Sequence, residues 1–165
     1  MFSGNFSFRN GLYAGLLGAV GLGLYLFQLW TPGHQVRLHS AHLLAAFEAN
    51  DWPAATEFLD VSYQDQWGHD RALLMTRLRQ ILPYARRLRL SAREIIVRAG
   101  QGLGEWRARV TVEADPNEVT NLIKERINPL PEPFALQWRQ NSKKPWDWKL
   151  VRVTNPALEL TSEGF

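Results

Sequence analysis

Few residues of this sequence have the types and spacing that chemistry requires. The chain contains no cysteine, so thiol catalysis, disulfides and thiolate metal sites are excluded. His39 and His42 are three residues apart on a predicted helix, but no acidic residue stands at a usable position beside them, and zinc needs three or four ligands. A glycine-rich phosphate loop, a Ser-His-Asp arrangement and a nucleic-acid-binding motif are also missing. We therefore expect no metal, no cofactor and no nucleic-acid partner.

A basic stretch follows the third predicted helix. It consists of Arg86, Arg87, Arg89, Arg93 and Arg98. Such a stretch could contact lipid headgroups or an acidic partner, or it could be the solvated face of an edge strand, where charge discourages aggregation. The net charge of +3 is small for 165 residues, so the overall electrostatics do not indicate a nucleic-acid-binding protein.

The charged residues divide the chain into two regions. Residues 1–30 contain one charged side chain, Arg9, whereas residues 31–165 contain 18 of the 19 Lys and Arg and all 16 Asp and Glu. The uncharged run Gly11–Trp30 would be about 30 Å long as a helix, which matches the hydrocarbon thickness of a bilayer. It is apolar on all sides, ends at an interfacial tryptophan, and precedes no small-x-small cleavage site. The run therefore predicts a retained transmembrane helix rather than a core helix or a signal peptide.

The residues around this run predict its orientation. The amino terminus and Arg9 flank one side and Arg37 is the nearest charge on the other, which favours a cytoplasmic N-terminus and an extracytoplasmic domain. Small residues recur four positions apart at Gly11, Gly15 and Ala19 and at Ala14 and Gly18. This spacing could support helix dimerisation and hence a homodimer, although glycine is also simply common in membrane helices.

Residues 36–156 have the length and composition of one domain with a single core. We expect it to be preceded by a tail (1–10), the membrane helix (11–30) and a linker (31–35), and followed by a tail (157–165). Apolar residues at helical spacing predict helices over 34–50, 52–59 and 70–82. Asp51 can cap the second of these helices, and Pro83 stops the third.

The second half of the domain changes to the period of strands. Alternation of apolar and polar residues predicts strands around 88–97, 106–113, 134–138 and 146–154. A change of parity within the first strand predicts a bulge near Arg93-Glu94, and residues 117–128 fit either a short helix or a loop. Three helices followed by an antiparallel sheet predict an α+β fold in which the sheet bends around the helices.

Two segments and the order of these elements resemble the nuclear transport factor 2-like superfamily. The segments are Ala49-Asn50-Asp51-Trp52, between the first two helices, and Tyr63-Gln64-Asp65-Gln66-Trp67-Gly68, after the second. The closing strand Trp146-Asp147-Trp148-Lys149-Leu150 is also similar, and the resemblance covers residues 36–154. It implies a cone-shaped, cystatin-like domain that often encloses an apolar pocket. The superfamily includes ketosteroid isomerases, polyketide cyclases and non-enzymatic modules, so the fold does not fix the function.

The resemblance gives Asp65 two alternative roles. In the isomerase-like members, the Asp of an Asp-x-x-Gly segment is the general base in the pocket, and Asp65 with Gly68 matches that segment. Those enzymes also use an oxyanion donor, usually a Tyr on the first helix, but the corresponding residue here is Leu43, which cannot donate. Alternatively, Asp65 caps or braces its own loop, for instance together with Asp70. The missing donor makes the bracing role our prediction.

The other candidate pocket residues are aromatic residues and one histidine: Tyr63, Trp67, His69, Trp106, Trp138, Trp146 and Trp148. They could line an apolar ligand site or form the ordinary core between sheet and helices. The sequence thus predicts a membrane-tethered, non-catalytic module for protein interaction or assembly that could hold a small apolar ligand. The alternative is a ketosteroid isomerase- or cyclase-like enzyme that uses Asp65 as its general base.

Overall fold

The computed structural model of the protein describes residues 8–159. The helices are α1 (Phe8–Leu29), α2 (Pro32–Glu48), α3 (Trp52–Phe58), α4 (Arg71–Ile81), the short 3₁₀ helix η1 (Leu82–Tyr84) and α5 (Glu118–Ile127). The strands are β1 (Arg89–Gly100), β2 (Leu103–Glu113), β3 (Phe134–Gln140) and β4 (Trp148–Thr154). Most of both predicted tails lies outside the described residues.

The four strands form one antiparallel sheet in the order β1-β2-β3-β4. The turn Gln101-Gly102 joins β1 to β2, and both of its residues have positive φ angles (52° and 76°), as a type I′ hairpin turn requires. The predicted bulge is present, because the register of β1 shifts between Arg93 and Ile96 and Glu94 has a φ of 56°. The predicted α+β architecture with an antiparallel sheet is thereby confirmed.

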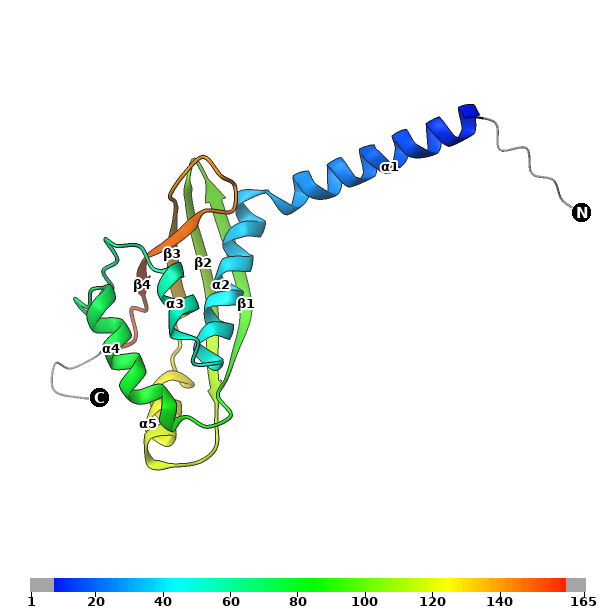
Figure 1. Ribbon diagram of the computed structural model, residues 1–165. Helices are drawn as coiled ribbons and strands as arrows, with labels where there is room; N and C mark the ends of the chain where they lie inside the picture. Colours follow the sequence, from blue (N-terminus) through cyan, green and yellow to red (C-terminus); the bar gives the residue numbers. More distant parts are fainter. Residues whose placement is uncertain (1–7, 160–165) are drawn as a thin grey trace, which may run out of the picture.

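The helices cover one face of the sheet (Figure 1). Helix α2 packs on β1 and β2, and α3 packs on α2 and β4. In β2, Trp106 and Ala108 are buried beneath the helices while Arg107 and Arg109 point to solvent, as the alternation of the strand predicts. The core therefore lies between α2, α3 and the concave face of the sheet.

Side-chain caps explain where the helices start. Asp51 accepts a hydrogen bond from Ala54 N at 3.1 Å, so it caps α3 as predicted, and Asp70 caps α4 in the same way. Residues 117–128 form helix α5, because Asn117 and Thr120 make a reciprocal capping box in which each side-chain oxygen accepts from the other backbone N–H at 2.9 Å. This local pairing decides between the helix and the loop.

Two expectations differ from the structure. The prediction that Trp146 belongs to the last strand is wrong: β4 starts at Trp148, and Trp146 lies in a turn with 53% of its side chain exposed. That turn closes because Asp147 N donates to the Lys144 carbonyl, at 3.2 Å. In addition, α2 begins at Pro32, inside the predicted linker, since proline is favoured in the first turn of a helix.

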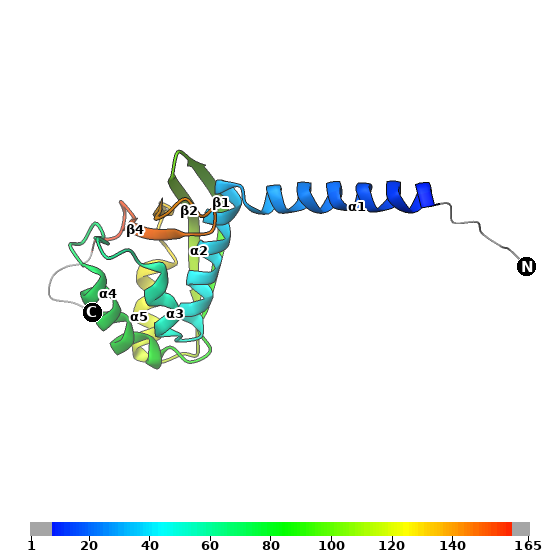
Figure 2. The ribbon, with the colours of Figure 1, turned by 45° about the horizontal axis from the view of Figure 1, so that its top comes forward.

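Helix α1 projects away from the domain (Figures 1 and 2). It meets the domain at its C-terminal end, where Gln35 Nε2 donates to the Leu29 carbonyl at 2.9 Å and the ring centroids of Trp30 and Trp146 are 6.3 Å apart. Within the described residues, no helix alone has the length and hydropathy of a membrane span. Tyr13–Leu29 and Pro32–Glu48 reach that level only as a pair, with a bend of 63° between them.

Candidate functional site

A cavity of about 250 Å³ lies between the helices and the sheet. Its walls come from the C-terminal half of α2, from α4, from α5 and from the strands, through residues such as Leu43, Phe47, Leu78, Ile123, Val110 and Leu136. Asp65 is the one charged residue among the described residues that line it. Apolar cavities of about 150 Å³ already bind benzene and stay dry without it. The cavity is therefore large enough for a small apolar molecule.

Four of the predicted pocket residues meet at this cavity: Tyr63, Asp65, Trp67 and Trp106. His69 stands behind Asp65 and is buried there, outside the lining. The remaining tryptophans are elsewhere. Trp138 and Trp148 are buried at the end of the domain next to α1, and Trp146 is exposed at that end. Whether any of these residues binds a ligand stays a prediction.

Asp65 is held by hydrogen bonds from its own loop. Its Oδ1 accepts from Trp67 N at 2.9 Å and from His69 N at 2.8 Å, and its Oδ2 lies 2.9 Å from His69 Nδ1. The carboxylate is 1% exposed, so these bonds replace the water that burial removes. Both oxygens are thus engaged in fixing the turn before α4. Asp70 acts separately, as the α4 cap.

The hydroxyl of Tyr63 is the second polar group of the site. Tyr63 is 2% exposed. Burial, and after it the charge of Asp65, raises the pKa of Tyr63, so its phenol stays protonated at neutral pH. Leu43, at the position that the resemblance assigns to an oxyanion donor, lines the cavity with an aliphatic side chain. The cavity therefore has one buried phenol and one carboxylate with three hydrogen bonds from its own loop, in otherwise mostly apolar walls.

A second polar cluster lies outside the cavity, where the α3–α4 connection meets β3. Asp60 accepts hydrogen bonds from Ser62 Oγ at 2.7 Å and from Arg139 Nη2 at 3.0 Å. Burial alone would raise the pKa of Asp60, but the bonds from Ser62 and Arg139 together lower it below its ordinary value. This cluster fastens the loop that carries Asp65 to the sheet.

The α4 and α5 walls of the site were not predicted as such. Leu74, Leu78 and Leu82 have helical spacing, which predicts a buried face but does not say whether that face meets other side chains or a cavity. Ile123 and Ile127 belong to the segment whose sequence fits both a helix and a loop. Among residues 8–159, we find no group of three or more His, Asp and Glu placed to hold a metal ion.

Helices on one face of a four-stranded antiparallel sheet, with an apolar cavity between them, define the nuclear transport factor 2-like or cystatin-like fold. A nuclear transport factor 2-like protein of unknown function from Pseudomonas putida is similar to this chain with a TM-score of 0.55 and 8% identity, over 73% of this chain and 82% of that one. The CaMKII hub of S. rosetta is similar with a TM-score of 0.55 and 15% identity, over 74% of this chain and 94% of the hub.

The structure of Bd1075 from Bdellovibrio bacteriovorus is also similar, with a TM-score of 0.56 and 9% identity over 72% of this chain, but the match spans 39% of that protein. No protein-family model matches the sequence, and no curated protein matches it. Identities this low show the fold alone. They confirm the resemblance at the level of the fold, and the function has to be argued from the site and from α1.

Proposed function

We propose that the protein is a membrane-tethered, non-catalytic module that holds a small apolar molecule and takes part in protein assembly. The observation that carries this proposal is the combination, in one chain, of an exposed apolar helix and a domain whose core is complete without that helix. The core residues that we describe all belong to α2 and the elements after it. Among the α1 residues whose burial the structure describes, none belongs to either core cluster.

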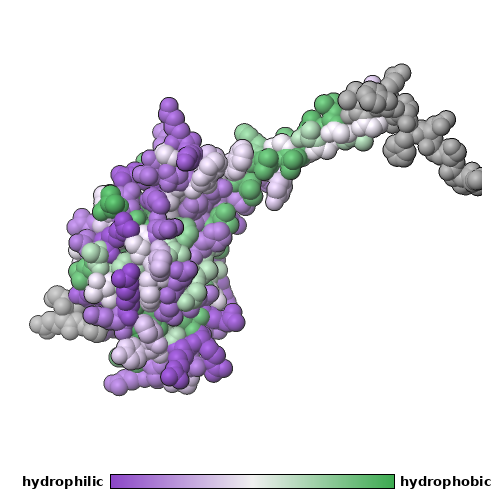
Figure 3. Space-filling model, viewed as in Figure 1, coloured by the Kyte–Doolittle hydropathy of each residue, from purple (hydrophilic) through white to green (hydrophobic). Residues whose placement is uncertain are grey.

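The tether is argued from the surface of α1. Leu16, Leu17 and Val20 are 53–72% exposed, as are further apolar residues such as Leu24 and Phe27 at 65% and 74%, and Figure 3 shows hydrophobic residues along the visible face of the helix. Tyr13–Leu29 alone does not have the length and hydropathy of a span. The whole of α1, which begins at Phe8, has 22 residues and a length of about 33 Å, close to the thickness of a bilayer's hydrocarbon core. An apolar helix with so much exposed surface is unfavourable in water. Lipid would cover its apolar side chains, and the helical backbone already satisfies its own hydrogen bonds. The flanking charges favour a cytoplasmic N-terminus.

The non-catalytic role is argued from Asp65. A general base must reach the substrate with a lone pair, and the loop already occupies three of the about four acceptor positions of the Asp65 carboxylate, which is 1% exposed. The apolar lining supports binding of an apolar molecule, for which Tyr63 offers one hydroxyl. The CaMKII hub has the same fold, and the small residues of α1, such as Gly15 and Gly18, leave open space that a second copy of the helix could fill.

Extraction of membranes tests the tether. The full chain should stay with membranes washed in alkaline carbonate, whereas the double variant Leu17→Arg/Val20→Arg should leave them, because two arginines at the centre of a span are costly. The control Leu73→Arg places one arginine on the domain surface, where Leu73 is 41% exposed, and should not change the fractionation. Release of the wild-type chain by carbonate would contradict the tether.

A melting experiment tests the cavity. Benzene should raise the melting temperature of the full chain in detergent, since a ligand that binds only the folded state stabilises it. Val110→Phe fills part of the cavity and should abolish that rise, while Leu73→Arg should preserve it. An equal shift in the wild type and in Val110→Phe would show that benzene acts elsewhere. Turnover of isomerase or cyclase substrates that Asp65→Asn removes would favour the enzyme alternative.

A further inference from the structure

The end of the domain next to α1 is built from two turns that touch each other. One is Gln101-Gly102 of the β1–β2 hairpin and the other is the β3–β4 loop, residues 141–147. Gln140 N donates to the Gly102 carbonyl at 2.8 Å, which joins the two turns. The start of α2 packs onto the same end, because Val36 contacts the backbone at Gly104. The two turns and the start of α2 therefore present one surface at the exit of α1.

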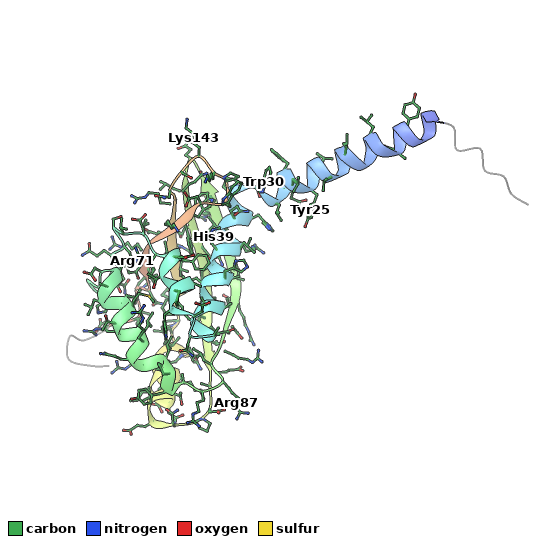
Figure 4. All side chains as sticks on the ribbon, viewed as in Figure 1. Tyr25, Trp30, His39, Arg71, Arg87 and Lys143 are labelled. Atoms are coloured by element: carbon green, nitrogen blue, oxygen red, sulfur yellow. The ribbon has the colours of Figure 1, made fainter. Side chains whose placement is uncertain are left out.

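This surface carries exposed cationic and apolar side chains. Lys143 and Lys144 are exposed, Trp146 is 53% exposed and Leu103 is 62% exposed. Among the described residues, neither lysine forms an ion pair with an acidic side chain. Figure 4 shows Lys143 at the outermost point of the β3–β4 loop, at the same end of the domain as Trp30. The positive charge of this loop is thus available to an external partner.

The β3–β4 loop is fixed in position and in contact with α1. Gln140 Nε2 donates to the Lys144 carbonyl at 2.9 Å, and Asn141 N donates to the Asp147 carbonyl at 2.8 Å. The ring of Trp146 contacts that of Trp30, which is 44% exposed at the C-terminal end of α1. Two half-exposed tryptophans and two lysines thus lie at the end of an apolar helix. This combination is typical of protein segments at a membrane–water interface, where indole rings lie at the headgroup level and lysines contact lipid phosphates.

We infer that this end of the domain is a membrane-contact face, on which Lys143 and Lys144 bind anionic lipid headgroups while Trp146 enters the interface beside Trp30. This inference rests on the proposed tether, because α1 brings the loop to the bilayer, and it requires anionic lipid in the leaflet on the domain's side. The cavity is at the other end of the sheet, so it faces away from the lipid. Charge complementarity favours an anionic bilayer over a neutral one, and the attraction decays within a Debye length.

Single cysteines can report the depth of each region, because the chain has no native cysteine. Ser142→Cys, Leu17→Cys and Glu113→Cys are labelled with the environment-sensitive fluorophore NBD in the full chain, reconstituted in nanodiscs of phosphatidylcholine with or without about 30 mol% phosphatidylserine. Glu113 is the control, since it lies opposite Arg89 in the register of β1 and β2, at the end of the hairpin away from the Gln101-Gly102 turn. A quencher on the lipid acyl chain reports a label within the hydrocarbon core, and a quencher on the headgroup reports a label at the membrane surface.

The expected result is quenching of the Leu17 label by the chain quencher, quenching of the Ser142 label by the headgroup quencher, and no quenching of the Glu113 label. Phosphatidylserine should increase the Ser142 quenching about twofold. The double change Lys143→Gln/Lys144→Gln should remove that increase. The change Arg86→Gln/Arg87→Gln should leave it, because Figure 4 shows Arg87 at the far end of the domain and Arg86 is its neighbour in the sequence.

The outcomes separate the two proposals. An unquenched Leu17 label would refute the tether itself. A quenched Leu17 label with a Ser142 label that stays as unquenched as Glu113 would overturn the membrane-contact face alone, and would leave the two lysines to an acidic protein. Quenching of Ser142 that is the same with and without phosphatidylserine would also overturn it, because lipid charge would then have no part in holding the loop.

Discussion

The two ends of the domain are built from different kinds of side chain. Next to α1, the space between α2 and the sheet is filled by Trp138 and Trp148, each at most 2% exposed, and by Val36 against Gly104. At the far end, under α4 and α5, most of the wall residues are leucine, isoleucine and valine, with Tyr63 and Trp106 among the aromatic ones, and a cavity of about 250 Å³ remains. The two ends therefore differ in how completely the side chains fill the space between helices and sheet.

This difference in filling suggests that the two ends have different roles, support of α1 and α2 at one end and ligand binding at the other. The filled end has to hold the start of α2 rigidly, because α1 continues from it and Trp30 rests on Trp146. Under the proposed function, the hollow end is the part of the domain that would hold the apolar molecule. The four predictions below test whether the two ends respond differently to the same kind of change, in order of expected size.

The largest effect is expected at the single charged group of the hollow end. Asp65→Ala should lower the free energy of unfolding by about 2–4 kcal/mol, because the buried N–H groups of Trp67 and His69 lose their acceptor. Asp65→Asn keeps an oxygen for both and should cost about 1 kcal/mol or less. Denaturant unfolding of the two variants measures this. Equal losses of unfolding free energy in the two variants would mean that Asp65 stabilises the fold through its charge and not through the hydrogen bonds that brace the loop.

At the filled end, Gly104→Ala should destabilise the protein by about 1–3 kcal/mol. A Cβ at this position would lie 2.4 Å from Val36 Cγ2 and 3.3 Å from the Trp148 ring, and neither side chain has room to retreat. Gly100→Ala, in the same hairpin, meets no atom within 4 Å and serves as the control. Thermal melts of the pair measure the contrast. A Gly104→Ala variant as stable as Gly100→Ala would show that this end is not tightly filled.

At the hollow end, an enlargement should be tolerated. Val110→Phe adds a ring toward the cavity and should change the free energy of unfolding by about 1 kcal/mol or less, because phenylalanine suits a strand and the space exists. The comparison with Gly104→Ala is the informative one, since Gly104→Ala adds only a methyl group. A loss larger than that of Gly104→Ala would contradict the contrast between the two ends.

The smallest effect is expected from His39, whose ring lies among Phe58 and Trp138 at the filled end, with centroid distances of 5.7 and 5.8 Å. Burial lowers the pKa of His39 below 6.5, although hydrogen bonds to the Gln35 and Trp146 carbonyls oppose it. Its pKa is thus lower in the folded than in the unfolded chain. Stability should be complete above pH 6.5 and decline as the pH falls below that value.

Melts between pH 7 and pH 5 measure this decline. The variant His39→Gln cannot titrate and should show a smaller decline than the wild type. His42→Gln removes the exposed neighbouring histidine and should behave as the wild type does. Identical pH profiles for His39→Gln and the wild type would show that the filled end does not exclude a proton from this ring.

Much of the fold could be predicted from local signals. Asp51 before Pro53 indicated the start of α3, the parity change at Arg93-Glu94 indicated the β-bulge, and the alternation in β2 indicated which side faces the core. Each of these signals is a pattern within a few consecutive residues. The bracing role of Asp65 belongs to the same class, since its partners Trp67 and His69 are two and four residues away.

The sequence by itself determined the division into an uncharged N-terminal run and one α+β domain, because charge distribution and hydrophobic periodicity are properties of consecutive residues. Only the tertiary structure decided which aromatic residues meet the cavity and which fill the opposite end. Trp106 and Trp138 have the same period-two spacing on neighbouring strands, yet one lines the cavity and the other packs against His39 and Phe58. The reason is that a cavity is the space left between side chains of distant elements, and no single segment of sequence records how far those elements stand apart.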